Sequence, residues 1–275
     1  MRLEGKTAVI TGGAQGIGAG IAIRLAEEGA SVVIADINEE KSKALASQIA
    51  EAGGRAIYVI CDVSDSDQVD TMFASTMAAF GRLDILVNNA ALVHHPASNK
   101  HFLELSAEDW LRALAINLTG MFYCSQRAGR IMVKQVAAGT ATGGSIINMG
   151  SGGGSRAHRQ LLAYDTSKGG IEAATRAMAL DLAPWKIRVN TLVPGNVTVD
   201  NSLGGATGPE AAVRTIPLGI PGTPTNIASA AAFLASNDAV YITGQRLVVD
   251  GGMEAQLRSP AVDVQIDLRI ADRLD

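Results

Sequence analysis

The chain has 275 residues, of which 47% are hydrophobic and 18% are charged, and its formal net charge is −4. This apolar content is enough for a sizeable core, and one large α/β domain accommodates the length. A weakly negative chain has no basic field for nucleic acid or acidic lipid, so we expect neither a nucleic-acid partner nor a membrane partner.

Seven short apolar runs predict β-strands along the chain. Helical patterns lie between most of them, and this alternation indicates an α/β fold with a doubly wound, Rossmann-like parallel sheet and helices on both faces. No internal repeat and no linker rich in Pro, Gly or Ser divides the sequence. The predicted strands cover residues 7–11, 30–35, 55–60, 83–87, 144–149, 187–192 and 246–249.

A glycine-rich turn follows the first predicted strand. Gly12, Gly16 and Gly18 lie between this strand and a helical pattern that begins at Ile17 and ends at Gly29. Glycines at this spacing let the backbone come close to a ligand, and the free N–H groups of a helix N-terminus favour a pyrophosphate. A glycine cluster alone is more often only a turn. The strand before it and the helix after it favour a dinucleotide site.

The second predicted strand ends in an acidic residue. Asp36 lies where a doubly wound domain places the carboxylate that binds the adenosine ribose. A carboxylate there accepts hydrogen bonds from both ribose hydroxyls and repels a 2′-phosphate, so we expect NAD rather than NADP. No lysine or arginine stands at Gln15 or Ile37 to bind such a phosphate. The alternative is that Asp36 caps the helix that starts near Asn38.

A tyrosine and a lysine four residues apart indicate acid–base chemistry. On a helix, Tyr164 and Lys168 share one face with Cβ atoms about 5–6 Å apart, and Ser151 lies upstream of them. Tyrosine has a pKa of about 10, and lowering it to about 7 requires roughly 4 kcal/mol. One cation at about 4 Å supplies that amount at an effective dielectric constant near 20, so we expect Lys168 to lower the pKa of Tyr164. The alternative is an accidental pair on a wet helix face.

Taken together, these motifs resemble a known family. Over residues 3 to about 254 the sequence is similar to the short-chain dehydrogenases/reductases of the common single-domain type. The resemblance implies one dehydrogenase domain over residues 1–255, followed by a C-terminal extension over 256–275 that either reaches a neighbouring subunit's cleft or frays. The matching positions are 11–18, 61–63, 88–90, Asn117, Ser151, Tyr164, Lys168, 194–195 and 250–252.

The resemblance implies hydride transfer between an alcohol carbon and a nicotinamide cofactor, with the hydroxyl proton passing to a positioned base. Asp62 and Val63 are expected to hold the adenine, and Asn89 and Ala90 to line the cofactor cleft. The implied catalytic residues are Asn117, which supports a water relay to Lys168, Ser151, which orients the reacting oxygen, Tyr164, which exchanges the proton, and Lys168, which binds the nicotinamide ribose. The expected cofactor-binding residues are Gly12, Gln15, Gly16, Ile17, Gly18, Asp36, Ile37, Asp62, Val63, Asn89, Ala90, Tyr164, Lys168, Pro194, Gly195 and Val197.

Two segments near the expected nicotinamide site depart from the family pattern. Val199 stands five positions after Pro194, where the family commonly has a threonine that contacts the nicotinamide amide, and Thr198 lies one position earlier. Residues 201–216 resemble a substrate-covering loop but are short and rich in glycine, which predicts an open or mobile lid.

Polar residues near the expected reaction centre suggest a substrate class. Arg156, His158, Arg159 and Gln160 follow Ser151, and the pair at 94–95 is His-His. A partly cationic rim of this kind fits a polyol, a sugar or a hydroxy acid. The alternative is that these side chains only solvate a surface loop or meet a neighbouring subunit. Two other functions stay open: an NADPH-dependent ketoreductase in biosynthesis and a non-catalytic dinucleotide-sensing protein.

The remaining features concern location and assembly. Two cysteines without zinc-ligand spacing argue against a disulfide framework and a metal site. Residues 1–6 lead directly into the first strand and leave no room for a signal peptide, so we expect a cytoplasmic enzyme. The helical patterns at 106–134 and 162–182 carry more apolar surface than one buried stripe needs. The resemblance implies that these helices build a dimer interface within a homotetramer.

Overall fold

The computed structural model describes residues 1–93, 99–199 and 213–258, and its centre is a parallel β-sheet. Within that part of the chain the sheet has seven strands in the order β3-β2-β1-β4-β5-β6-β7, and all of its pairings are parallel. The predicted doubly wound α/β fold is confirmed. The strands are β1 (Thr7–Thr11), β2 (Ser31–Asp36), β3 (Arg55–Ile60), β4 (Ile85–Asn88), β5 (Gly144–Met149), β6 (Ile187–Pro194) and β7 (Arg246–Val249).

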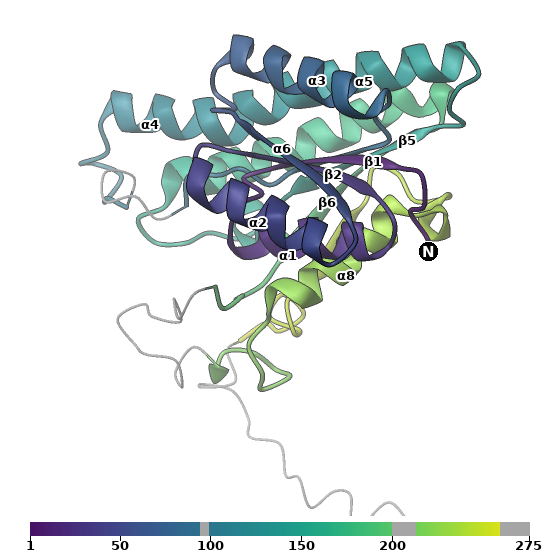
Figure 1. Cartoon of the computed structure of the whole chain (residues 1–275). Coiled ribbons are helices and arrows are strands. Elements are labelled where there is room, and N and C mark those ends of the chain that lie inside the picture. Colours follow the sequence, from purple (N-terminus) through teal and green to yellow (C-terminus); the bar gives the residue numbers. More distant parts are fainter. Residues whose placement is uncertain (94–98, 200–212, 259–275) are drawn as a thin grey trace, which may run out of the picture.

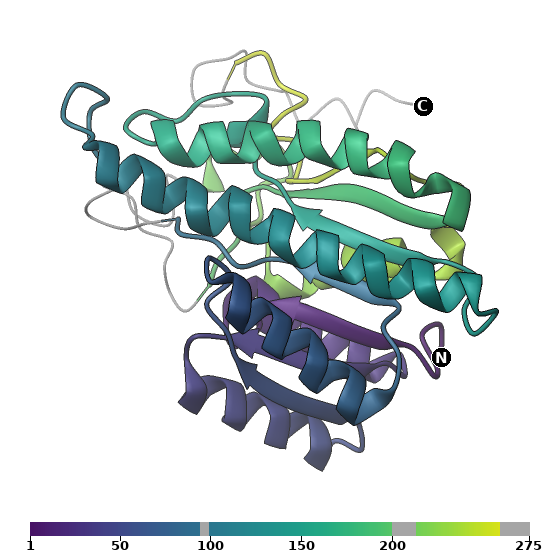
Figure 2. The same ribbon diagram turned by 90° about the horizontal axis from the view of Figure 1, so that it is seen from above.

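Helices cover both faces of this sheet (Figures 1 and 2). One face packs against α1 (Gly16–Glu27), α2 (Glu39–Glu51) and α8 (Pro224–Ala235). The other packs against α3 (Ser66–Phe80), α5 (Gly120–Ala137) and α6 (Leu162–Leu182), and α4 (Ala107–Leu114) lies beyond the end of α5. None of the helices in the described ranges is apolar over enough turns to cross a membrane.

Alternation along the strands separates the two cores. Ile10 and Ile34 point to the core under α1 and α8, whereas their neighbours Val9 and Val33 point to the core under α3 and α5. Successive side chains of a strand face opposite sides, so a strand covered on both faces must be apolar at every position. This requirement explains why the strands appeared in the sequence as continuous apolar runs.

The helical pattern over 106–134 is interrupted in the structure. Between α4 and α5 lies one π-helical turn, Ala115–Thr119, with Asn117 at its middle. A single π turn inserts one extra residue into an otherwise α-helical path and is frequent at functional sites. The Asn117 side chain is buried and bonds to the backbone of Leu92, beyond β4.

A buried polar chain ties together the strand ends that carry the site. The Asn88 amide donates to Asn148 Oδ1 at 2.8 Å and to Ser125 Oγ at 2.9 Å. The Asn148 amide in turn donates to Thr175 Oγ1 at 2.9 Å, and Thr191 donates to the same oxygen at 2.9 Å. These contacts join β4, β5 and β6 to α5 and α6. Asn88 Oδ1 has no hydrogen-bond partner in the described ranges, but the donors of this polar chain are all paired, and such buried bonds favour one arrangement of the elements.

Candidate active site

The glycine turn between β1 and α1 has the shape expected of a phosphate-binding loop. Gly12 has a φ of +59°, a conformation that favours glycine, and a Cβ at Gly18 would lie 2.1 Å from the Gly12 carbonyl oxygen. Helix α1 begins at Gly16, and its N-cap residue Gln15 makes no side-chain capping bond. The first N–H groups of the helix therefore keep their capacity to bind an anion.

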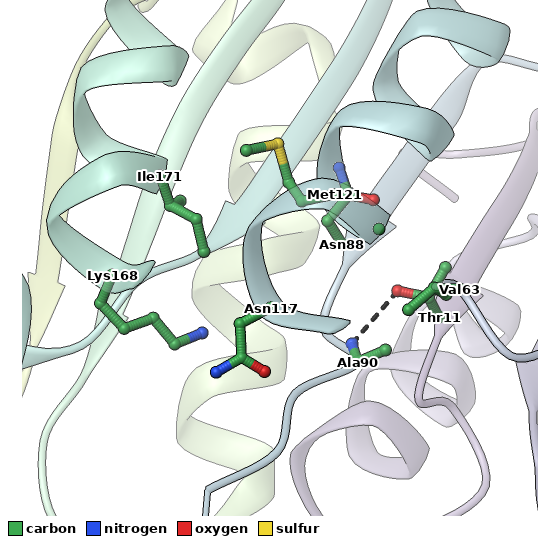
Figure 3. Close-up of a pocket in the computed structure, with 9 residues that line it drawn as sticks. Thr11, Val63, Asn88, Ala90, Asn117, Met121, Lys168 and Ile171 are labelled. Atoms are coloured by element: carbon green, nitrogen blue, oxygen red, sulfur yellow. Dashed lines mark hydrogen bonds between the residues drawn. The ribbon is translucent and has the colours of Figure 1, made fainter. Parts of the chain in front are cut away.

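Asn89 and Ala90 hold the entry to this turn from the neighbouring strand. Their backbone N–H groups both donate to Thr11 Oγ1 at 3.1 Å, and the Asn89 side chain donates to the Gly12 carbonyl at 2.8 Å. The Asn89 amide thus shapes the turn itself. Ala90 lines a small pocket together with Thr11, as Figure 3 shows.

Asp36 faces the same glycine turn. Its Oδ2 accepts a hydrogen bond from the Ala14 N–H at 3.0 Å, and its Oδ1 accepts one from the Asn38 N–H at 3.0 Å. Helix α2 is capped by Asn38, whose side chain accepts from the Lys41 N–H, so the alternative that Asp36 is the helix cap is wrong. A carboxylate held against the turn is positioned to meet an adenosine ribose.

A cation that the sequence analysis missed lies at this end of the site. Lys41 Nζ donates to Gln15 Oε1 at 2.6 Å, which brings an ammonium group to the residue before Gly16. The two residues are 26 positions apart, and only the packing of α2 beside the turn joins them. Ile37, where a cation could also bind a 2′-phosphate but where none stands, is 72% exposed.

Ser151, Tyr164 and Lys168 form a contiguous set beyond the carboxyl end of β5. The Ser151 hydroxyl lies close enough to the Tyr164 phenol to lower its pKa. Lys168 Nζ lies 5.5 Å from the centroid of the Tyr164 ring and donates to the Met149 carbonyl at 2.7 Å. Lys168 is only 3% exposed, so the alternative of an accidental pair on a wet helix face is wrong.

Burial changes the pKa values of both Tyr164 and Lys168. Burial lowers the pKa of Lys168 to about 8. Burial also raises the pKa of Tyr164 above its usual value, the hydrogen bond from Ser151 opposes this, and the charge of Asp165 adds to it. The sequence analysis expected Lys168 to lower the pKa of Tyr164. That expectation fails because burial removes both groups from water and favours their neutral forms.

Asn117 reaches the same pocket from the π-helical turn. Its amide donates to Ser167 Oγ at 3.2 Å, and Ser167 Oγ donates to the Tyr164 carbonyl at 2.6 Å. Figure 3 shows the Asn117 and Lys168 side chains pointing into one pocket. The structure therefore brings Asn117 beside the lysine, and the water relay between them remains a prediction.

The residues expected to hold the adenine lie at the end of β3. Asp62 Oδ1 accepts from the Ser64 N–H at 2.9 Å and from the Ser64 hydroxyl at 2.7 Å. Val63 is 4% exposed and touches Gly120 at the start of α5. The Asp62 turn thus lies at the same sheet edge as the glycine turn. Val63 belongs to the core and also lines the pocket that Asn117 and Lys168 enter (Figure 3).

The segment after β6 shows where the departure from the family pattern leads. Val199 packs against Gly16, because a Cβ on that glycine would lie 3.2 Å from Val199 Cγ1. Thr198 points elsewhere: its hydroxyl is buried and has no hydrogen-bond partner in the described part of the chain. Val197 forms a β-bridge with Gly222. Gly195, which follows Pro194, lies against Asp250, and a Cβ at this glycine would clash with the Asp250 backbone. At position 199, where the family commonly has a threonine, this chain therefore places a valine methyl group against the glycine turn.

The loop after Ser151 is tied to the C-terminal segment. The Arg156 guanidinium donates to the carbonyl oxygens of Met253, Glu254 and Gln256 at 2.8, 3.0 and 2.8 Å. Arg156 therefore holds backbone, while Arg159 and Gln160 are exposed. The predicted rim residues His94 and His95, residues 201–212 of the predicted lid and residues 259–275 of the predicted extension lie outside the described residues.

The chemistry of these groups fits a nicotinamide dinucleotide. The glycine turn leaves room for backbone contact, Asp36 meets the turn at one end, and the Ser151–Tyr164–Lys168 set lies toward the other. In the described ranges no group of three or more His, Cys, Asp or Glu side chains gathers as a metal site.

Comparisons with known proteins agree with this geometry. Residues 12–254 match the family model described as Enoyl-(Acyl carrier protein) reductase. The chain is 39% identical to D-threitol dehydrogenase of Mycolicibacterium smegmatis, covering 91% of this chain and 94% of that protein. It is 40% identical to 2,5-dichloro-2,5-cyclohexadiene-1,4-diol dehydrogenase of Sphingobium indicum, covering 91% and 97%. A solved short-chain type dehydrogenase/reductase from Mycobacterium marinum superposes with a TM-score of 0.84 at 35% identity, covering 92% and 97%.

The buried lysine should reduce the stability of the fold, and the reduction should depend on pH. A pKa near 8 in the folded state, against 10.5 for an ordinary lysine, means that folding opposes protonation. This cost is fully present below pH 8 and disappears as the pH rises through 10.5. It amounts to about 3 kcal/mol at neutral pH, at 1.36 kcal/mol per pKa unit.

We therefore expect Lys168→Met to raise the free energy of unfolding at pH 7 by about 1–2 kcal/mol, because the lost hydrogen bond to Met149 offsets part of the gain. The difference from the native protein should fall by about 2 kcal/mol between pH 7 and pH 9.5. Urea unfolding at the two pH values measures both quantities. Lys43→Met on the exposed face of α2 is the control, and an equal effect of Lys168→Met at both pH values would contradict the lowered pKa.

Proposed function

Because the chain belongs to the short-chain dehydrogenase/reductase family and is an oxidoreductase that acts on CH–OH groups, we propose that it oxidises a secondary alcohol of a polar small molecule to a ketone, with NAD as the cofactor. The observation that carries the proposal is the contiguous set of Ser151, Tyr164 and Lys168 beside the glycine turn. The proposed substrate class is a polyol, a sugar or a hydroxy acid. The names of two relatives, which concern threitol and a cyclic diol, support this class.

In the proposed reaction Tyr164 accepts the hydroxyl proton of the substrate while Ser151 orients the reacting oxygen. Lys168 binds the nicotinamide ribose, and Asn117 supports the water relay that carries the proton away. A bound nicotinamide dinucleotide supplies the hydride acceptor and, when oxidised, a positive charge. Burial alone disfavours the Tyr164 phenolate, and such a positive charge would offset that effect if it were held near the phenol.

Replacing the proposed base tests the mechanism. We expect Tyr164→Phe to lower kcat/KM by about 10²- to 10⁴-fold, because the hydroxyl proton then has no positioned acceptor. The assay is NADH formation with a panel of polyols, sugars, hydroxy acids and simple alcohols. Tyr241→Phe, at a side chain that is 100% exposed, is the control.

Two results would contradict this part of the proposal. Native activity in Tyr164→Phe would remove the tyrosine from the mechanism. Much faster turnover of aliphatic alcohols without other polar groups would exclude the polar substrate class, while leaving alcohol oxidation itself intact.

The preference for NAD rests on Asp36, and Lys41 opposes it. The carboxylate repels a 2′-phosphate, whereas the Lys41 ammonium beside Gln15 would attract one. We expect the native protein to prefer NAD, and Asp36→Ala to raise the ratio of kcat/KM for NADP over NAD by about 10- to 100-fold. Adding Lys41→Ala should reverse part of this gain, and Asp67→Ala on α3 is the charge-matched control. A native preference for NADP would contradict the proposal.

Two observations favour a second candidate, an NADPH-dependent ketoreductase in biosynthesis. The matching family model is described as an acyl carrier protein reductase, and Lys41 offers a cation for the extra phosphate. The ratio of kcat/KM for NADP over NAD in the native protein distinguishes the two candidates. A non-catalytic dinucleotide-sensing role has less support, because Asn117, Ser151, Tyr164 and Lys168 are all present.

We further propose that residues 1–255 act as one dehydrogenase domain within a cytoplasmic homotetramer. Both cysteines are free and buried, which suits a reducing compartment. Leu111 on α4, Phe122 on α5 and Leu180 on α6 are 63%, 49% and 76% exposed, which is surface that another subunit can cover. We expect light scattering of the purified protein to give four chains per particle. A monomer would contradict this assembly.

A further inference from the structure

Beside Tyr164 a histidine and an aspartate form a pair that the proposed hydride transfer does not use. His158 Nδ1 lies 2.8 Å from Asp165 Oδ1, and the His158 backbone N–H donates to Asp165 Oδ2 at 2.6 Å. The His158 and Tyr164 rings meet edge to face, with centroids 6.4 Å apart. The pair therefore joins the loop that follows Ser151 to the first turn of α6, at the residue next to the proposed base.

Close packing holds this pair in place. A Cβ at Gly153 would lie 2.0 Å from Asp165 Oδ1 and 3.1 Å from His158 Nδ1. The glycine run after Ser151 is thus required for the carboxylate and the imidazole to meet. Asp165 is mostly buried, with 12% of its side chain exposed, whereas 49% of the His158 side chain is exposed.

The bond to Asp165 determines which ring nitrogen stays available. An ionised carboxylate only accepts hydrogen bonds, so Nδ1 carries the hydrogen and Nε2 of the neutral ring presents a lone pair. Among the residues that the structure describes, none makes a hydrogen bond to Nε2, and the ring is half exposed. Nε2 is therefore an acceptor held in place beside Tyr164, and a substrate hydroxyl is one donor that suits it.

We propose that His158 Nε2 accepts a hydrogen bond from a second hydroxyl of the substrate, on the carbon next to the one that is oxidised. Because the His158 and Tyr164 rings are in edge-to-face contact, a substrate whose reacting hydroxyl meets Tyr164 brings the hydroxyl of the adjacent carbon toward the imidazole. The substrate is then a vicinal diol, and Asp165 is the positioning residue that orients the histidine. This inference rests on the proposed alcohol oxidation and narrows its substrate.

The test compares butane-2,3-diol with butan-2-ol, which lacks only the second hydroxyl. We expect the native enzyme to prefer the diol, and His158→Leu to lower the ratio of kcat/KM for the diol over butan-2-ol by about 10- to 100-fold, since one hydrogen bond to the substrate is lost. His158→Gln keeps an acceptor and should restore part of the ratio. His101→Leu, at another histidine on an exposed loop, is the control. NADH binding, followed by fluorescence, checks that each variant folds.

The outcomes separate this inference from the proposed function. An equal loss on both substrates would assign His158 to support of the loop, and an unchanged ratio would remove it from recognition; either result overturns the inference while alcohol oxidation stands. A native enzyme that oxidises neither these nor any other alcohol of the panel would overturn both proposals.

Discussion

The buried ammonium of Lys168 is the interaction on which the arrangement of the site depends. Its one hydrogen bond in the described part of the chain runs to the Met149 carbonyl at the end of β5, and its neighbours hold it almost entirely away from water. An isolated cation in such a place lowers stability, as the fall of its pKa to about 8 indicates. The surrounding fold must supply that energy, and the buried chain through Asn88 and Asn148 joins the elements around the lysine.

The same burial explains why Tyr164 and Lys168 do not by themselves produce a reactive base. Low dielectric raises the pKa of the Tyr164 phenol and lowers that of the Lys168 amine, so the phenol stays neutral unless another positive charge favours its ionised form. In the proposed reaction that charge comes with the oxidised cofactor. The base would then be activated mainly in the complex that is able to react, which couples proton transfer to cofactor binding.

Features that depend on local sequence were predictable, and features that depend on packing were not. Continuous apolar runs located all seven strands, and the four-residue spacing brought Tyr164 and Lys168 together, because strand burial and helical periodicity are local properties. The direction in which the Tyr164 pKa shifts was predicted wrongly, because the shift depends on how completely other segments bury the side chain. The contact of Lys41 with Gln15 and the π-helical turn at Asn117 also escaped prediction, since neither has a local signature.

In the proposed function, the loop after Ser151 adds substrate recognition to the reaction centre. At one point the loop is bound to the C-terminal segment through Arg156, and at another to α6 through the bond of His158 with Asp165. A loop held at two points can keep an imidazole in register with Tyr164, which a loop free to move cannot do. Gln256 contributes to this arrangement, because its side chain also donates to the Thr215 carbonyl. The first residue of the predicted extension therefore helps to hold the loop that presents His158, and under the proposed role of His158 substrate choice depends on residues distant in sequence from the proton-transfer set.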